Sequence, residues 1–357
     1  MKMIILLFIF TVTSSWAQNS CAPLNLITQK DSPFNKIPVF DQDGLGICYS
    51  YTASQLIDYQ LMKKGNKDRI VHPLWGALKF ADSAKQESIS SGTTYYAIKA
   101  IQDAGNCHLK SFDEAISTWT KKTNASESEI MGLVEKLAPK LGLLNTKVHQ
   151  DVVDEMIATA IEEHSPYCST NISWNQLMPE LRSLSLLSSR KLLSNLVLPV
   201  CNKPSRISIT NPRFNLPAQD EQWIPAIDSK LDELNAPIAV SYCARGLYDE
   251  SYDGVNRKTA TTPLGVKPDC SNHESIIAGK KQINGKCHFL LRNSWGSGFH
   301  SSNKDRKCLC KSRKTGKFLD DCQEELHNDG DNIVEACWIS EDVFSKNAFG
   351  LTYLDKK

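Results

Sequence analysis

Three segments that lie far apart in the chain contain the residue types of a thiol-dependent acyl-transfer site. Cys48 begins an apolar helical pattern, His273 begins a short apolar strand, and Asn293 follows the next strand. A thiol attacks a carbonyl carbon as the thiolate, so a catalytic cysteine needs nearby positive charge to lower its pKa below the usual value of about 8.5. Amides at a helix N-terminus and an imidazolium both provide such charge. We therefore predict a thiolate–imidazolium pair in which Cys48 is the nucleophile and His273 is the base.

Two amide side chains complete this predicted site. The side-chain carbonyl of Asn293 can accept a hydrogen bond from the His273 ring and fix its tautomer and orientation. Gln42 stands six residues before Cys48 across a glycine-containing loop. From there its amide can reach the oxyanion of a tetrahedral intermediate, beside the backbone N–H of Cys48. His273 would then protonate the leaving amine and activate the water that hydrolyses the acyl-enzyme.

A helix is expected to position Cys48 at its N-terminus. Apolar residues recur after Cys48 at helical spacing, and Gly65 is expected to end the helix. These apolar residues are Ala53, Leu56, Ile57 and Leu61.

A β-hairpin is expected to bring His273 and Asn293 into one neighbourhood. Asn284-Gly285 lies between two apolar strands and is typical of a two-residue hairpin turn. With the turn centred there, Asn293 would face Ile276 instead of His273. A bulge or a longer loop is therefore required to pair the two side chains.

The remaining pattern changes along the chain from helix-rich to strand-rich. Apolar stripes predict helices over 130–137 and 153–161, residues 199–217 are interpreted as a linker, and a helix over 227–234 precedes a strand over 238–240. This order predicts the α+β class.

Composition restricts the partners. The 357 residues carry 41 Lys and Arg against 40 Asp and Glu, a formal net charge of +1, and no basic cluster is interleaved with aromatic residues. We therefore expect no nucleic acid partner. Neither a metal nor another cofactor is expected, and the oligomeric state is left open.

The first residues predict export. Lys2 precedes an apolar run over 3–12, and Ser15-Trp16-Ala17 is typical of a cleavage site, so 1–17 is predicted to be a signal peptide. A membrane anchor is the alternative, but spanning a bilayer takes about 20 apolar residues. The mature chain is expected to be secreted or periplasmic, with no stable membrane insertion.

The 12 cysteines all follow the predicted cleavage site and indicate disulfides. If Cys48 stays reduced, at most five bridges form and one further cysteine is left over. A zinc site is the alternative for the cluster near the C-terminus, although structural zinc sites usually begin with Cys-x2-Cys. That cluster contains Cys308, Cys310, Cys322 and His327.

Each part of the predicted site also has an ordinary structural interpretation. A lone cysteine at a helix start is usually half of a disulfide, a lone histidine before a strand usually lies in the core, and Trp295 could be a buried hydrophobic residue. The combination of the three segments in this order favours catalysis.

These segments resemble the papain family of cysteine peptidases. Gln42–Ser50 is similar to the family's active-site cysteine segment, Asn272–Gly279 to its histidine strand, and Asn293–Phe299 to its Asn-Ser-Trp-Gly segment. The resemblance implies a papain-like two-lobe fold, in which a helical lobe carries Cys48 and a β-barrel-like lobe carries His273 and Asn293. It also implies a substrate cleft between the lobes.

The resemblance further implies which residues contact substrate. Trp295 would cover the His–Asn hydrogen bond, and Ser91-Gly92 is similar to a Gly-Gly segment that pairs with substrate backbone. The expected substrate-binding residues are Gly92, Thr93, Asn272 and Trp295.

The chain departs from the family pattern near the site. Ile47, Tyr49 and Glu274 replace the family's usual residues beside the nucleophile and the histidine, and Glu274 would raise the pKa of His273 if it lay close. The interval between Cys48 and His273 is also longer than is usual in the family.

We expect a signal peptide over 1–17 and one peptidase domain over 18–357. Within it, 18–119 is expected to form the helical lobe, about 120–217 a helical insertion that restricts or recruits substrate, and 218–357 the β lobe with a cysteine-rich end.

The expected function is a secreted cysteine endopeptidase acting on a peptide or protein substrate. One alternative is a papain-like binding protein that has lost turnover and recognises peptides or another exported protein. The other is acyl transfer to an amine, although transglutaminase-like enzymes pair the histidine with Asp and lack the Asn-Ser-Trp-Gly segment.

Overall fold

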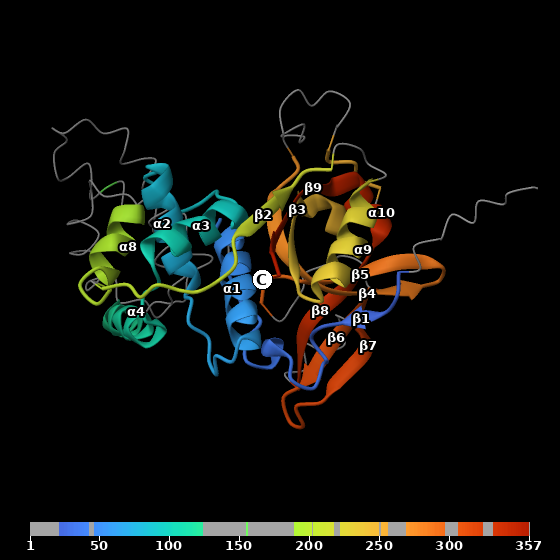
Figure 1. The fold of residues 1–357 in the computed structure, drawn as a ribbon, viewed down its shortest axis with the longest axis horizontal. Coiled ribbons are helices and arrows are strands. Elements are labelled where there is room, and N and C mark those ends of the chain that lie inside the picture. The colour runs from blue at the N-terminus through green and yellow to red at the C-terminus, as the bar shows by residue number, and fades with distance from the viewer. Residues whose placement is uncertain are drawn as a thin grey trace, which may run out of the picture.

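Five of the described helices gather on one side of the molecule, and the antiparallel sheet lies on the other with the remaining two helices packed on it (Figure 1). The computed structural model describes residues 21–42, 46–123, 155, 189–201, 203–217, 222–249, 251–255, 269–296, 306–323 and 331–356. The helices are α1 (Cys48–Lys63), α2 (Pro73–Ala84), α3 (Thr94–Ala104), α4 (Leu109–Thr123), α8 (Ser189–Val197), α9 (Trp223–Leu234) and α10 (Glu341–Asn347), with 3-10 turns η1 (Pro33–Asn35) and η4 (Ala244–Leu247). No helix in these ranges is both long and apolar enough to span a membrane.

The strands form one nine-stranded antiparallel sheet in the order β2-β9-β3-β4-β5-β8-β6-β7, with β1 also paired to β4. They are β1 (Leu24–Asn25), β2 (Pro212–Asn215), β3 (Ile238–Cys243), β4 (Asn272–Ile283), β5 (Lys286–Arg292), β6 (Lys307–Ser312), β7 (Phe318–Gln323), β8 (Asn332–Ser340) and β9 (Ala348–Leu354). The predicted α+β class and the two groups of elements are confirmed. The β lobe, however, is an open sheet in the described ranges, because β2 and β7 at its ends are not paired with each other.

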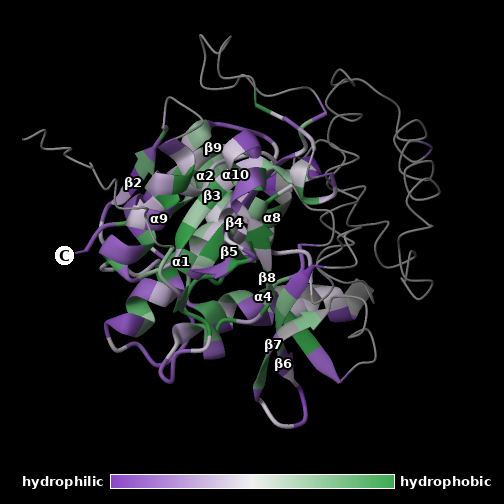
Figure 2. Ribbon diagram, turned by 90° about the vertical axis from the view of Figure 1, so that its right-hand side faces the viewer, coloured by the Kyte–Doolittle hydropathy of each residue, from purple (hydrophilic) through white to green (hydrophobic). Residues whose placement is uncertain are grey.

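The central strands are buried on both faces. Because successive side chains on a strand point to opposite faces, Ile276 packs into the core around α1, whereas Ile277 packs into the core under α9 and α10. In Figure 2 the hydrophobic colour concentrates where α1 meets the central strands, and the outer turns are hydrophilic. This packing fixes β4 against the helix that begins at Cys48.

Helix α1 begins and ends where the sequence predicts. It runs from Cys48 to Lys63, and Gly65 follows with a φ of 103°, a left-handed conformation suited to glycine. Its residues are buried between α2, α3 and β4, so the helix forms the interface between the helical group and the sheet. The N-terminus of α1, where Cys48 stands, thus lies in a helix that contacts both the helical group and the sheet.

The β4–β5 hairpin contains the bulge that the sequence requires. Asn284 and Gly285 both have positive φ, as a two-residue hairpin turn needs. Lys280 pairs with Phe289 near the turn, but beyond a register shift Ile276 pairs with Arg292. The bulge moves the end of β5 by one position and takes Asn293 away from Ile276.

Five disulfides link the described cysteines: Cys21–Cys287, Cys107–Cys201, Cys243–Cys270, Cys308–Cys337 and Cys310–Cys322. The predicted limit of five bridges is met in these ranges, and the cysteines of the C-terminal cluster form disulfides instead of a zinc site. Cys48 is the free cysteine of the described residues. Cys168, His327 and the predicted signal peptide lie outside them.

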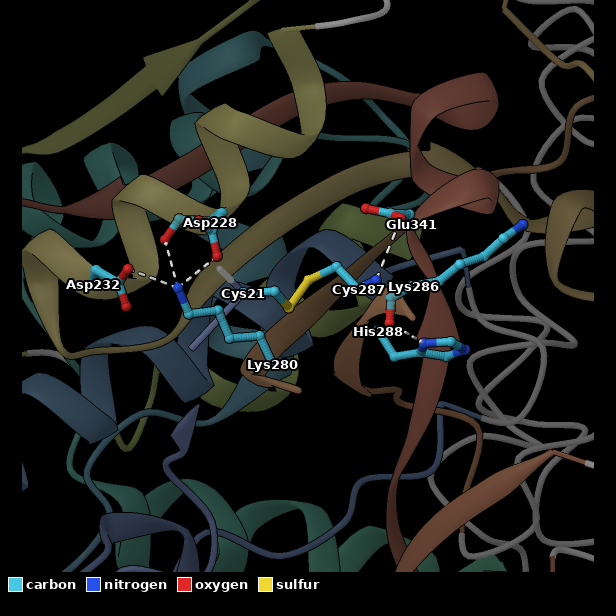
Figure 3. The surroundings of a disulfide bond; sticks show 8 residues. All are labelled: Cys21, Asp228, Asp232, Lys280, Lys286, Cys287, His288 and Glu341. Carbon is cyan, nitrogen blue, oxygen red and sulfur yellow. Dashed lines mark hydrogen bonds and ion pairs between the residues drawn. A yellow bond between two sulfur atoms is a disulfide. The ribbon is translucent and has the colours of Figure 1, made fainter. Parts of the chain in front are cut away.

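The N-terminal segment is fastened to the sheet. Cys21 is bonded to Cys287 on β5, and nearby the fully buried Lys280 places its Nζ 2.5 Å from Asp228 Oδ1 and 2.7 Å from Asp232 Oδ2 (Figure 3). A buried ammonium requires compensating negative charge, which the two aspartates of α9 supply. The ion pairs therefore join β4 to α9.

The predicted insertion lies mostly outside the described residues, including the stripes expected over 130–137 and, apart from Glu155, over 153–161. Residues 212–215 of the expected linker form β2, which pairs with β9. Local turn residues gave no indication of this strand because its hydrogen bonds come from a distant partner.

The partly buried N-cap of α2, His72, gives a testable acid sensitivity. Leu74 N–H donates to His72 Nδ1 at 3.2 Å, so the ring is neutral and its contact with Asp113, 3.6 Å from Nε2, is not an ion pair. Burial, together with Arg69, lowers the pKa of His72 to about 3. Below the ordinary pKa of 6.5 the unfolded chain therefore binds a proton that the folded protein excludes, and stability is lost as the pH falls.

The His72→Asn variant keeps a capping acceptor but has no imidazole to protonate. Between pH 7 and about 4.5, we expect its free energy of unfolding to fall by about 2 kcal/mol less than that of the unmodified protein. Urea unfolding at both pH values measures the difference. The exposed His108→Asn variant is the control. Parallel losses in the unmodified protein and in His72→Asn would contradict the prediction.

Candidate active site

Cys48 is the first residue of α1 and keeps partial access to solvent. Backbone amides of Glu274, Tyr49 and Cys48 itself lower the pKa of its thiol. Tyr49 and Cys48 contribute amides from the helix N-terminus, as the sequence predicted, whereas Glu274 immediately follows His273 on β4. Helix α1 is also bonded to the start of the histidine strand, because Thr52 Oγ1 donates to the backbone oxygen of Glu274 at 3.1 Å.

His273 and Asn293 meet as expected. His273 Nε2 lies 2.6 Å from Asn293 Oδ1, and both residues are buried. A carbonyl oxygen only accepts, so Nε2 carries the proton. In the neutral ring the basic nitrogen is therefore Nδ1.

Further donors hold the Asn293 carbonyl in place. Its Oδ1 also accepts from Ser294 N–H at 2.8 Å and from Ser275 Oγ at 3.2 Å. Ser275 Oγ in turn lies 3.0 Å from the Tyr242 hydroxyl, and the Tyr242 ring meets His273 edge-on with centroids 5.6 Å apart. This network fixes the ring orientation from β3 and β4.

Aromatic rings cover the histidine. The partly buried Trp295 packs on His273 with centroids 4.4 Å apart, and Tyr248 stacks on Trp295 at 6.1 Å. The two rings thus cover His273, which is 4% exposed.

Gln42 reaches the same corner from the N-terminal side. Its backbone N–H donates to Ser294 O at 2.8 Å, and its Oε1 accepts from Ser294 Oγ at 2.6 Å. The Gly296 N–H donates to Phe40 O and so adds a second backbone bond between these two segments. Gly296 has a φ of 78°, and a Cβ there would collide with the carboxylate of Asp41. The Gln42 amide is therefore held with its oxygen toward Ser294.

The expected substrate-binding residues lie around this corner in different settings. Ser91 adopts a φ of 69° and donates to Gly46 O, which sets the Ser91-Gly92 segment beside the loop before Cys48. Gly92 has no room for a Cβ, which would lie 2.6 Å from the Tyr49 ring. Thr93 is the N-cap of α3, and Asn272 is exposed at the start of β4.

Burial favours the neutral forms of both reacting groups. Burial, and secondarily the charge of Glu274, raise the pKa of the Cys48 thiol to about 12 despite the backbone donors. Burial lowers the pKa of His273 to about 4, which the bond to Asn293 only partly offsets. Glu274 thus acts on Cys48 and is not among the causes of the His273 shift, which differs from our expectation. Both groups are therefore favoured in their neutral forms, a thiol and an imidazole.

The site includes residues that we did not predict: Tyr242, Ser275, Ser294 and also Ser241, whose hydroxyl donates to Glu274 Oε1 at 2.8 Å. Ser294 stands inside the Asn-Ser-Trp-Gly segment, and Ser275 occupies the same strand face as His273, two residues later. These positions could have identified both serines. No local pattern marks Ser241 or Tyr242.

No protein-family model matches the chain, and no curated protein matches its sequence. Among solved structures, xylellain, a cysteine protease from Xylella fastidiosa, matches with 11% identity and a TM-score of 0.46 over 94% of this chain and 86% of that chain. Digestive procathepsin L 3 of Tenebrio molitor larval midgut matches with 14% identity and a TM-score of 0.41 over 96% and 72%. A structure concerning the mite allergens Blo t 1 and Der p 1 matches with 11% identity and a TM-score of 0.40 over 89% and 66%.

These structural neighbours are papain-like cysteine proteases, the family that the three sequence segments resemble. At these identities and TM-scores, we base the function on the geometry of the site alone.

Proposed function

We propose that the protein is an exported cysteine endopeptidase that hydrolyses peptide bonds through Cys48 and His273. The observation that supports this most is the convergence of three distant segments. The His273 ring lies 2.6 Å from Asn293 Oδ1, and the helix that begins at the free Cys48 donates from Thr52 Oγ1 to the backbone oxygen of Glu274, next to His273, at 3.1 Å. Every other described cysteine is in a disulfide, whereas the cysteine at this corner is free.

The proposed reaction begins from the neutral pair. Cys48 transfers its proton to His273 Nδ1 as the sulfur adds to the carbonyl carbon, so the thiolate–imidazolium pair forms during attack. The oxyanion accepts from the Gln42 side-chain amide and the Cys48 backbone N–H. His273 then gives the proton to the leaving amine, and as a base it activates the water that hydrolyses the thioester.

The substrate is proposed to be a peptide or protein that contacts Gly92, Thr93, Asn272 and Trp295. We further propose that the insertion over about 120–217 restricts or recruits substrate. The five disulfides are typical of an oxidising, extracytoplasmic compartment and support export.

A binding protein without turnover is the second candidate. The raised pKa of Cys48 and the lowered pKa of His273 favour it, because both shifts oppose a reactive thiolate.

A thiol-peptidase probe decides between these candidates. We expect an epoxide or vinyl-sulfone probe to label Cys48, and Cys48→Ala to lower peptide cleavage by at least about 10³-fold. Peptide mapping locates the label, and Cys168→Ala is the matched cysteine control, with unchanged cleavage. Labelling without turnover would support the binding protein, whereas amine incorporation without hydrolysis would support acyl transfer.

A further inference from the structure

Glu274 connects the candidate site to both lobes through a buried carboxyl group. Its Oε1 accepts from the Ser241 hydroxyl at 2.8 Å, and its Oε2 accepts from the Thr94 N–H at 2.7 Å. Its backbone oxygen accepts from Thr52 Oγ1 on α1 at 3.1 Å. One residue next to His273 thus bonds to α1, α3 and β3.

The Thr94 hydroxyl reveals which protonation state fits this network. Thr94 Oγ1 contacts Glu274 Oε2 and also lies 3.1 Å from the backbone oxygen of Tyr49. A hydroxyl has one proton, and a carboxylate and a carbonyl both only accept. With Glu274 ionised, Thr94 can therefore satisfy only one of the two acceptors.

A protonated Glu274 satisfies both. Its Oε2–H donates to Thr94 Oγ1, and Thr94 then donates to Tyr49 O. The remaining Oε1 still accepts from Ser241. Burial, partly offset by the bonds from Thr94 and Ser241, raises the pKa of Glu274 above its ordinary value, in agreement with this geometry.

The charge of Glu274 acts directly on the nucleophile. The Glu274 carboxyl group is bonded to Thr94, whose hydroxyl reaches the backbone oxygen of Tyr49, the residue after Cys48. A negative charge on Glu274 disfavours a second one on the sulfur and so raises the pKa of Cys48. The titratable groups at this corner include Cys48 on α1, His273 on β4 and Tyr242 on β3, and the charges of Tyr248 and Arg306 also act on Tyr242. Helix α3 contributes the uncharged Thr94. Within the described residues, no cation is among the causes of the Glu274 shift.

We propose that Glu274 is a protonation-dependent positioning residue, which as the neutral acid fastens α3 to the sheet beside Cys48 and as the carboxylate suppresses the Cys48 thiolate. The site is then most easily activated at pH values where Glu274 is protonated. The role of Glu274 in catalysis rests on the proposed peptidase function, whereas its effect on the ionisation of Cys48 does not.

The alkylation rate of Cys48 by iodoacetamide, followed against pH in the full chain, tests this proposal. For the unmodified protein we expect a bend in the profile above pH 4.5, the ordinary pKa of Glu274, where its ionisation slows the reaction. In Glu274→Gln the bend is lost, and alkylation at pH 8 is about tenfold faster, the equivalent of one pKa unit. Because alkylation needs no substrate, the result is independent of peptidase activity.

Two further variants keep the test decisive. Glu335→Gln also alters a buried glutamate, equally 7% exposed and bonded to Arg292, and should leave the Cys48 profile unchanged. Ser241→Ala removes a donor to the carboxylate and should move the bend to higher pH, which decides the matter if Glu274→Gln does not fold. An unmoved profile in both Glu274→Gln and Ser241→Ala, or an equal change in Glu335→Gln, would overturn the proposal.

Discussion

His273→Ala is expected to lower kcat/KM for peptide cleavage by at least about 10³-fold. Without the imidazole, the Cys48 thiol loses its proposed proton acceptor during attack, and burial keeps the thiol protonated at neutral pH because it raises the pKa of Cys48 to about 12. Steady-state cleavage of a fluorogenic peptide measures the loss. Alkylation of Cys48 at high pH should persist, because direct ionisation of the thiol does not require His273.

His288→Ala is the matched control, because His288 lies on the neighbouring strand β5, where its Nδ1 lies 3.2 Å from the Lys286 backbone oxygen. We expect its activity to stay within about twofold of the unmodified protein. Since burial lowers the pKa of His273 to about 4, the acid limb of kcat/KM should lie near pH 4 rather than near 6.5. A His273→Ala variant with activity within tenfold of the unmodified protein would contradict the proposed base.

The elements that hold the site were predictable because their determinants are local. Helical spacing and Gly65 indicated α1, and Asn284-Gly285 indicated the turn of the β4–β5 hairpin. The need for a bulge also followed from counting residues across that turn. Its position between Ile277 and Lys280 did not, because it depends on packing against α1 and on the pairing of β5 with β8.

The parts of the site that join separate elements were not predictable. Ser241 lies on β3 and Thr94 on α3, and neither stands near His273 in sequence, yet both donate to the carboxylate next to it. The sequence indicated that Glu274 is unusual beside the histidine. Its effect on Cys48 instead of His273 depends on the direction of its side chain, which only the packed lobes determine.

The same limit applies to the charge state of the reacting pair. Residue types alone predict a thiolate–imidazolium pair, because a helix N-terminus and a histidine both favour the thiolate. Burial of Cys48 and His273 acts in the opposite direction on both groups. Substrate binding would therefore have to compensate for desolvation, and loss of the Glu274 charge would reduce the barrier to forming the pair.

The largest change in stability is expected from Arg292→Met. Arg292 is 1% exposed, and it donates to Ile37 O at 2.7 Å, to Glu335 Oε2 at 3.3 Å and to the Gln55 side chain. Removing the guanidinium leaves a buried carboxylate without its cation, so the free energy of unfolding should fall by about 3–5 kcal/mol. Chemical denaturation with the disulfides intact measures this loss.

The double variant Arg292→Met/Glu335→Leu separates loss of charge pairing from loss of packing. It removes the stranded carboxylate, so we expect at least half of the lost stability to return, because a buried ion pair replaced by apolar side chains is often close to neutral. Arg213→Met is the surface control: its ion pair with Asp355 is 2.6 Å long, but the arginine side chain is 62% exposed, so less than about 1 kcal/mol should be lost. If the double variant were as unstable as Arg292→Met, the guanidinium would act through packing on Phe34 and Gln55 and not by compensating Glu335. Since Arg292 immediately precedes Asn293, that result would make side-chain packing, rather than charge, the factor that sets the end of β5 and the carbonyl facing His273.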